Sequence, residues 1–131
     1  MASKYEAQTF GLSQVGQIAV PVTDVDRAIV FYRDILGMRF LFQAPPGLAF
    51  FDLAGVRLML DGPAADRAGS GSVIYFKVSE LHEAFSTLSK RGVNFEANPH
   101  LIAKMPDHEL WMAFFRDPDK NLFALMSEVT E

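Results

Sequence analysis

The stretch QIAVPVTDVDRAIVFYRDILGM, residues 17–38, contains a strand, a helix and the turn between them. Residues 17–22 alternate apolar side chains with small or polar ones, which is the period of a strand with one buried face. Asp24 or Thr23 can then cap a helix, because a side-chain oxygen accepts from the free N–H groups of the first turn. Gly37 ends that helix. Its apolar stripe consists of Val25, Ala28, Ile29, Tyr32, Ile35 and Leu36.

Strand-like segments follow this helix, and turn residues separate them. They are MRFLF (38–42), LAFFDLA (48–54) and VRLML (56–60). The sequence APPG and the glycine at Gly55 are turn signals between them. Residues 14–62 therefore predict a βαβββ module.

The second half of the chain repeats this order. Ser79 can cap a second helix that ends at Gly92. The predicted strands are VIYFKV (73–78), VNFEA (93–97), LWMAFF (110–115) and NLFALM (121–126). The letters repeat too, because residues 17–24 align with residues 73–80 at a shift of 56 (73 − 17).

The repeat divides the chain into four segments that together form one domain. We predict an N-terminal arm over 1–13, the first module over 14–62, a linker over 63–71 and the second module over 72–128. The linker is rich in Gly, Ala and Ser. In each module one helix covers one face of the sheet, so the other face must be covered by a second sheet or a ligand. A cleft between two such faces is a typical small-molecule site.

Composition excludes several classes of site. The chain has 131 residues, a net charge of −4 and a pI of about 5.3, which argues against a nucleic-acid partner. It has no cysteine, which excludes disulfides, thiolate nucleophiles and zinc fingers. No apolar run suits a signal peptide or a membrane span, so we expect a cytoplasmic protein that does not enter a membrane.

The segments QIAVPVTDVDRAIVFYRDILGM and MAFFRDPDKNLFALMSE resemble the vicinal oxygen chelate superfamily, which includes glyoxalase I, extradiol dioxygenases, fosfomycin-resistance enzymes and bleomycin-resistance proteins. The resemblance covers about residues 14–128. It implies an α+β fold in which two βαβββ modules form a curved eight-stranded mixed sheet, a cup with helices on its outer face. It also implies a homodimer, in which the modules pair within one chain or between two. It does not fix a reaction.

Metal-using members of the superfamily hold a divalent ion with four side chains inside the cup. Carried over by position, these fall on Gln17, Met59, Val73 and Ala124. Valine and alanine have no donor atom, and a thioether is a poor ligand for a hard ion. We therefore predict that the inherited metal site is absent and that the protein has no cofactor. The RDPDKN hairpin, where the family usually has glycine in place of Lys120, is predicted to be structural.

The cup residues are expected to bind a small-molecule ligand. The expected ligand-binding residues are Gln17, Arg57, Met59, Val73, Tyr75, Trp111, Leu122 and Ala124. Gln17 either satisfies nearby backbone or water, or hydrogen-bonds the ligand. Arg57 would suit a carboxylate or phosphate, whereas the acidic balance of the chain would suit a cationic ligand. The sequence does not assign the faces of residues 111–115.

Three functions remain open from the sequence. The first is a metal-free protein that binds a ligand in an apolar cup, as the bleomycin-resistance branch does. The second is a lyase or isomerase with Gln17, Tyr75, Arg57 and His100 around the substrate, His100 being the weak catalytic candidate. The third is a glyoxalase with displaced metal ligands from PHLIAKMPDHELW (99–111), a predicted loop whose polar residues include His100, Asp107, His108 and Glu109.

Overall fold

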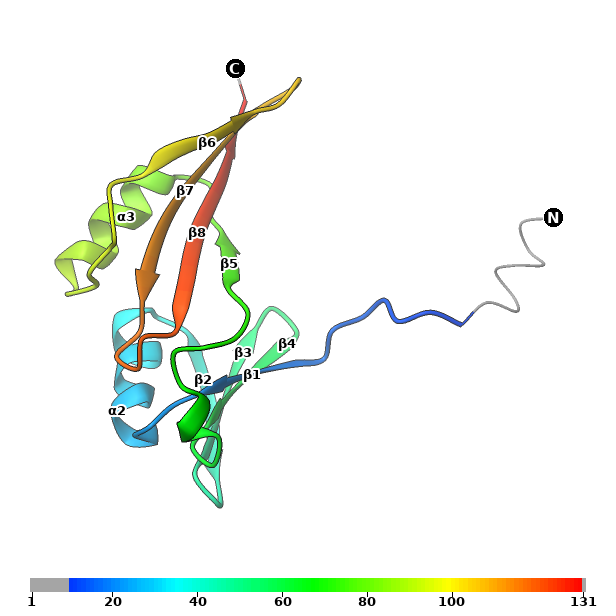
Figure 1. Cartoon of the computed structure of the whole chain (residues 1–131), viewed down its shortest axis with the longest axis vertical. Helices are drawn as coiled ribbons and strands as arrows, with labels where there is room; N and C mark the ends of the chain where they lie inside the picture. The colour runs from blue at the N-terminus through cyan, green and yellow to red at the C-terminus, as the bar shows by residue number, and fades with distance from the viewer. Residues whose placement is uncertain (1–9, 131) are drawn as a thin grey trace.

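The computed structural model describes residues 10–130, which form two four-stranded mixed sheets (Figure 1). The first sheet has the order β1-β4-β3-β2, with β1 (Gln17–Pro21), β2 (Arg39–Ala44), β3 (Leu48–Leu53) and β4 (Val56–Asp61). The second has the order β5-β8-β7-β6, with β5 (Ile74–Lys77), β6 (His100–Lys104), β7 (Glu109–Arg116) and β8 (Leu122–Val129). The predicted α+β fold of two βαβββ modules is confirmed. No strand pairing joins the two sheets within residues 10–130.

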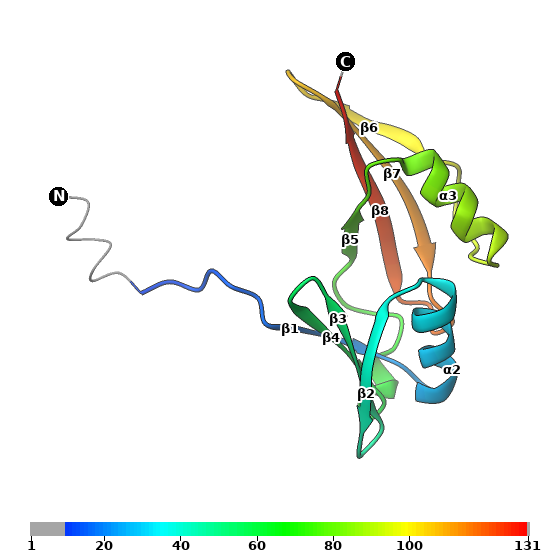
Figure 2. The same cartoon turned by 180° about the vertical axis from the view of Figure 1, so that it is seen from behind.

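Each module places one helix against its sheet, and both helices lie on the same side of the molecule (Figure 2). In the first module, α2 (Val25–Ile29) continues as a π-helical segment, η1 (Val30–Ile35). The Asp24 carboxylate caps α2 by accepting from the Arg27 N–H at 3.1 Å. In the second module, α3 (Leu81–Lys90) begins without a side-chain cap, so the expected cap at Ser79 is wrong.

The linker between the sheets carries one short 3₁₀ helix, η2 (Ala65–Arg67). Residues 10–16 extend away from the rest of the chain, and Phe10 is 87% exposed (Figures 1 and 2). The rest of the expected N-terminal arm, residues 1–9, lies outside the described residues. Over residues 10–130, no helix combines the length and the apolar character that crossing a bilayer requires.

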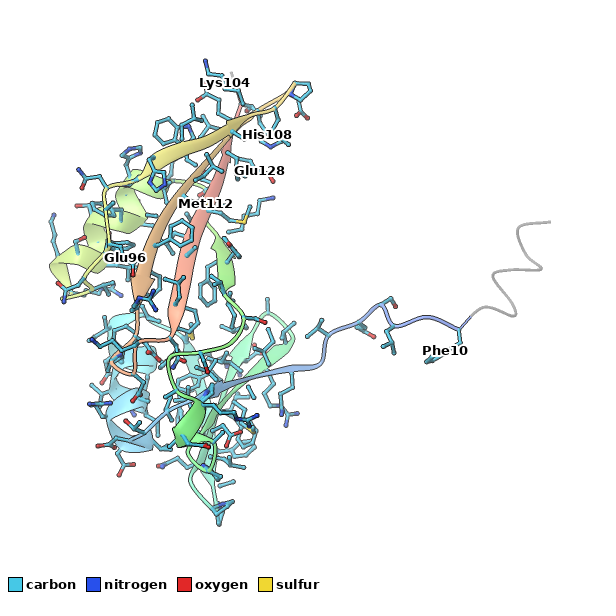
Figure 3. The ribbon with its side chains drawn as sticks, in the orientation of Figure 1. Phe10, Glu96, Lys104, His108, Met112 and Glu128 are labelled. Atoms are coloured by element: carbon cyan, nitrogen blue, oxygen red, sulfur yellow. The ribbon has the colours of Figure 1, made fainter. Side chains whose placement is uncertain are left out.

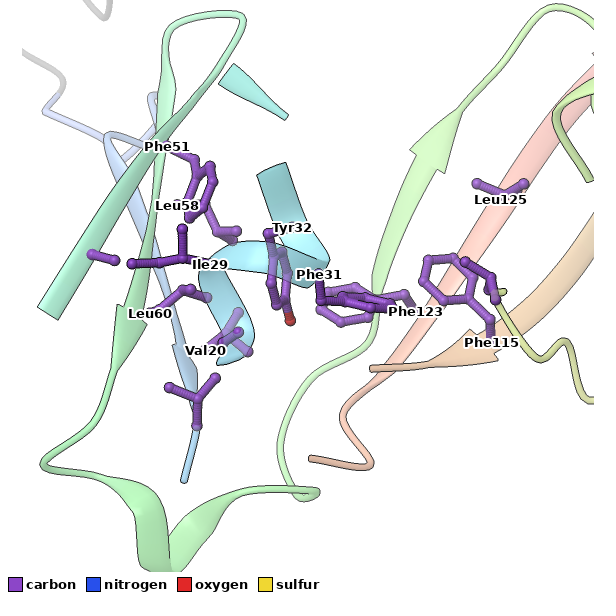
Figure 4. Packing of buried hydrophobic residues seen from close by; sticks show 14 of the residues in the cluster. Val20, Ile29, Phe31, Tyr32, Phe51, Leu58, Leu60, Phe115, Phe123 and Leu125 are labelled. Carbon is purple, nitrogen blue, oxygen red and sulfur yellow. The ribbon is translucent and has the colours of Figure 1, made fainter. Parts of the chain in front are cut away.

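One hydrophobic core joins the two modules. In Figure 4, Tyr32 and Phe31 lie between Phe51 of the first sheet and Phe123 of the second. The Tyr32 ring centroid is 6.0 Å from that of Phe51 and 6.0 Å from that of Phe123. Phe123 in turn stacks on Phe115 at 5.7 Å. Burial of these rings helps to hold the modules together.

The second strand of the second module differs from the prediction. VNFEA is not a strand, and only Phe95 forms an isolated bridge, to Phe115. The strand is instead β6, inside the segment expected to be a loop. A register shift between Leu101 and Ala103 interrupts its alternation, which is why no period of two is visible in the sequence. The Phe95 ring packs against the Phe85 ring, with 4.5 Å between the ring centroids. This apolar residue is therefore part of the helix packing and does not mark a strand.

A buried polar network links the two modules through the RDPDKN hairpin. Asp117 accepts from the Tyr32 hydroxyl at 2.6 Å and from the backbone N–H groups of Asp119 and Asn121 at 2.9 and 2.8 Å. The Asn121 amide donates to the Pro21 carbonyl of β1 at 2.8 Å. Lys120 has a φ of +72°, a left-handed conformation that glycine adopts more easily. These bonds support the predicted structural role of the hairpin.

A second carboxylate of this hairpin contacts the start of α2. Asp119 is buried and accepts from the Thr23 N–H at 3.1 Å, from the Thr23 hydroxyl and from the Arg27 guanidinium at 2.9 Å. These contacts fix the end of β1 and the start of α2 against the second module. The orientation of one sheet relative to the other therefore depends on this hairpin as well as on the aromatic core.

Candidate functional site

Each sheet has one face that turns away from the helices, and we call these two surfaces the open faces. Strand side chains alternate between faces, so the neighbours of buried core residues point outward. On the first sheet the open face comprises Gln17, Ala19, Pro21, Arg39, Phe42, Leu48, Phe50, Asp52, Arg57, Met59 and Asp61. On the second it comprises Tyr75, Lys77, His100, Met112, Phe114, Arg116, Leu122, Ala124, Met126 and Glu128. Val73 directly precedes β5 in the same alternation.

The sequence repeat is also a repeat of strand register. In the first sheet Ala19 lies opposite Met59, and in the second Tyr75 lies opposite Ala124. The shift is 56 along β1 to β5 (75 − 19) and 65 along β4 to β8 (124 − 59). Gln17 and Val73 therefore hold equivalent positions in the two modules.

On the open face of the first sheet, a side-chain amide lies against a thioether and a guanidinium lies over an aromatic ring. The Gln17 amide nitrogen lies 3.7 Å from the Met59 sulfur. The Arg57 guanidinium carbon lies 5.6 Å from the centroid of Phe50, a cation–π distance. Phe50 in turn lies 4.8 Å from Phe42, centroid to centroid.

The open face of the second sheet is mainly apolar and aromatic. Tyr75 meets the Phe114 ring edge-on at 6.2 Å, and His100 stacks on the same ring at 6.4 Å. The His100 Nδ1 lies 3.1 Å from the Asn98 carbonyl oxygen. Ala124 lies opposite Phe114 in the register and is fully buried.

The structure places seven of the eight expected ligand-binding residues in line with the open faces. Trp111 lies on the opposite face, 5.8 Å from His82 of α3, and its indole N–H donates to Glu109 at 3.1 Å. The other seven are divided between the two sheets. Four surface pockets were located in the described part of the chain, and Gln17, Met59, Val73 and Ala124 line none of them. A single chain therefore does not bring these four positions together in any of those pockets.

His100, His108 and Glu109, the displaced metal ligands of the third hypothesis, are not gathered around one point among the described residues. The His108 Nδ1 lies 2.7 Å from the Asp107 carboxylate, and this hydrogen bond lowers the pKa of Asp107. Figure 3 shows His108 near the tip of the β6–β7 hairpin, apart from Met112 midway along the sheet. Within residues 10–130, no three His, Asp or Glu side chains gather closely enough to hold an ion.

Sequence reasoning missed several aromatic residues of the open faces, including Phe42, Phe50 and Phe114. Both modules contain the pair FF, at 50–51 and 114–115, and two adjacent aromatics give no signal of which one points inward. In the structure Ala49 and Ala113 are buried, so by alternation Phe50 and Phe114 lie on the open faces. A cavity of about 430 Å³ between α3 and the first module, lined partly by Leu36, was also not foreseen. It depends on the packing of one module against the other.

Comparison with known proteins identifies the family. The sequence profile of the Glyoxalase/Bleomycin resistance protein/Dioxygenase superfamily matches residues 14–125. The chain belongs to this superfamily. Among its relatives, the uncharacterized protein YraH of Bacillus subtilis (strain 168) is 27% identical over 126 residues, covering 83% of this chain and 94% of YraH.

Solved structures of the superfamily show the same fold. TnmS3, an antibiotic binding protein from Streptomyces sp. CB03234, has a TM-score of 0.73 and 25% identity, covering 92% of this chain and 99% of TnmS3. Lactoylglutathione lyase from Agrobacterium tumefaciens has a TM-score of 0.70 and 20% identity, covering 89% of this chain and 95% of the lyase. These two proteins are a binding protein and an enzyme, so the shared fold alone does not assign a reaction.

The four positions to which the resemblance assigns the metal ligands do not fit a divalent ion. They present one amide, one thioether and two hydrocarbon side chains, at Gln17, Met59, Val73 and Ala124. Hard divalent ions require several oxygen or imidazole donors. The amide nitrogen of Gln17 lies 3.7 Å from the Met59 sulfur.

Proposed function

We propose that this protein binds a small, mainly apolar molecule between its open faces, and that it does so without a divalent ion. The observation that carries the proposal is the apolar surface that a single chain leaves uncovered. Phe42 and Tyr75 are each 47% exposed, on different sheets. Apolar patches of this kind mark ligand or protein interfaces. The antibiotic-binding relative TnmS3 supports binding as the activity.

The binding cup is completed by a second copy of the chain. The open face of the first module in one chain meets the open face of the second module in its partner, and twofold symmetry gives two equivalent cups. Positions 17 and 59 on the first sheet and positions 73 and 124 on the second then line the same cup. This homodimer acts in the cytoplasm on a small-molecule ligand.

Binding without turnover is the better-supported activity. A lyase or isomerase needs an acid or a base placed against its substrate. His100, the histidine on the open faces, has its ring stacked on Phe114 and its Nδ1 next to the Asn98 carbonyl. These contacts favour a role for His100 as part of the cup surface and not as a catalytic base.

Two glutamate substitutions test the proposal. Phe42→Glu places a charge on the open face, and Val30→Glu places one on the surface of η1, where Val30 is equally exposed at 49%. We expect Phe42→Glu to sediment as a monomer and to lose binding of naphthalene-2-carboxamide, a neutral aromatic probe. We expect Val30→Glu to keep both properties. A Phe42→Glu variant that stays dimeric and binds the probe as the wild type does would contradict the proposal.

A further inference from the structure

Arg57 differs from the other basic residues of the open faces in having no carboxylate partner within residues 10–130. The other three each have one: Arg39 with Asp52 at 3.9 Å, Lys77 with Glu128 at 3.8 Å and Arg116 with Glu96 at 2.7 Å. The Arg57 guanidinium instead lies over the Phe50 ring. Its N–H donors are therefore available to a ligand.

Gln17 provides a second donor beside Arg57. The two residues lie opposite each other in the parallel pairing of β1 with β4, and both are exposed on the same face. Among residues 10–130, the hydrogen-bond partner of the Gln17 amide nitrogen is the Met59 sulfur, which is a weak acceptor. A planar guanidinium and an adjacent amide form a set of donors that matches the two oxygens of a carboxylate.

Within residues 10–130, the nearby carboxylates form no ion pair with Arg57. Asp52 lies opposite Arg57 in the register, but its carboxylate accepts from the Gly55 N–H at 3.1 Å and pairs with Arg39. Asp61 accepts from the Ala64 N–H at 3.2 Å. Both carboxylates are thus engaged by adjacent turns or by another arginine.

The internal repeat makes the two walls of the cup chemically different. The second-module positions equivalent to Gln17 and Arg57 are Val73 and Leu122, which are both apolar. Their neighbours include the edge-on pair of Tyr75 and Phe114. One wall therefore offers donors for an anion, whereas the other offers aromatic and aliphatic surface.

We propose that the cup binds a planar aromatic carboxylate. Its carboxylate contacts Arg57 and Gln17, and its ring lies between the exposed Phe42 and the aromatic wall of the second module. This inference rests on the proposed function, because it concerns the same cup. The proposed ligand is an anion, whereas the net charge of −4 suggested a cation. The side chains next to a ligand affect its binding more than the total charge of the protein does.

The test compares three probes of equal shape by isothermal titration calorimetry on the full chain. They are naphthalene-2-carboxylate, the neutral naphthalene-2-carboxamide and the cationic 2-(aminomethyl)naphthalene. We expect the carboxylate to bind about ten- to hundredfold more tightly than the amide, since a charged hydrogen-bonded pair contributes on that scale. The Arg57→Gln variant is expected to bind the carboxylate and the amide equally. Arg39→Gln removes an arginine that has a carboxylate partner on the same face, and should keep the preference.

The outcomes separate the inference from the proposed function. Equal binding of all three probes, or tightest binding of the amine, would leave a binding cup in place but overturn the preference for a carboxylate. A carboxylate preference that survives in Arg57→Gln would overturn the assignment to Arg57. If the wild type binds none of the probes, both the proposed function and this inference fail.

Discussion

The hydrogen bond between Tyr32 and Asp117 gives a direct test of how the two modules are held together. Tyr32 belongs to the first module and is fully buried, and its hydroxyl donates to Asp117 of the second module at 2.6 Å. Replacing Tyr32 by Phe removes the hydroxyl but keeps the ring, which contacts Phe31, Phe51 and Phe123. Tyr32→Phe therefore isolates the hydrogen bond from the packing of the ring.

The expected cost follows from the partners of Asp117. After the substitution, its Oδ2 still accepts from the Asn121 amide at 2.9 Å, and its Oδ1 keeps two backbone donors. The loss is therefore that of one charge-assisted bond, about 1.5–3 kcal/mol in the free energy of unfolding. Urea denaturation followed by circular dichroism measures this difference. The slope with urea should not change, because both variants expose the same surface.

Tyr75→Phe is the matched control, since Tyr75 is exposed and its hydroxyl makes no hydrogen bond to the protein among the described residues. It should change the free energy of unfolding by less than about 0.5 kcal/mol. If Tyr32→Phe were no more destabilising than Tyr75→Phe, the polar connection between the modules would not contribute to stability, and this reasoning would be refuted.

Three further predictions concern stability. Burial, and then the neighbouring Asp117, raise the pKa of Tyr32 well above its ordinary value of 10.0, so the folded state keeps this proton longer than the unfolded chain does. This contribution to stability is present below pH 10.0 and is lost as the pH rises above it; urea titrations should show this fall in the wild type but not in Tyr32→Phe. Lys120→Gly should raise the free energy of unfolding by about 0.5–1 kcal/mol, because glycine adopts the positive φ at this position without strain, and an unchanged or lower urea midpoint would contradict this. Gly62→Ala should lower the free energy of unfolding by about 1–3 kcal/mol, because the new Cβ would lie 2.7 Å from the Gly47 carbonyl oxygen. The control Gly16→Ala should change it little, because its Cβ would meet nothing within 4 Å. Equal effects of the two substitutions would refute the clash.

The fold was largely predictable because its signals are local. The stripe from Val25 to Leu36 packs inward, with Ala28, Ile29 and Tyr32 buried, and the glycines at 37 and 92 adopt positive φ where the helices end. β6 was missed because its register shift puts two apolar residues in succession, Leu101 and Ile102, which no alternating pattern predicts. Short-range periodicity therefore identified elements with regular pairing but did not identify the irregular one.

The candidate site was only partly predictable, because it depends on contacts between residues far apart in the sequence. The repeat placed Gln17, Met59, Val73 and Ala124 at equivalent positions, and the strand register agrees with that alignment. The sequence could not place Trp111, since the residues around it are apolar on both faces of β7. The missing carboxylate partner of Arg57 is likewise visible only when the neighbouring ion pairs are known.

The central claim is that the cup holds its ligand without a metal ion, and one titration tests it directly. Binding of naphthalene-2-carboxamide is measured on protein dialysed against a chelator, and again after addition of Zn²⁺, Mn²⁺ or Ni²⁺. The account predicts the same dissociation constant in every case, because Gln17, Met59, Val73 and Ala124 offer too few donors for such an ion. Binding that disappears after chelation and returns with a divalent ion would contradict it.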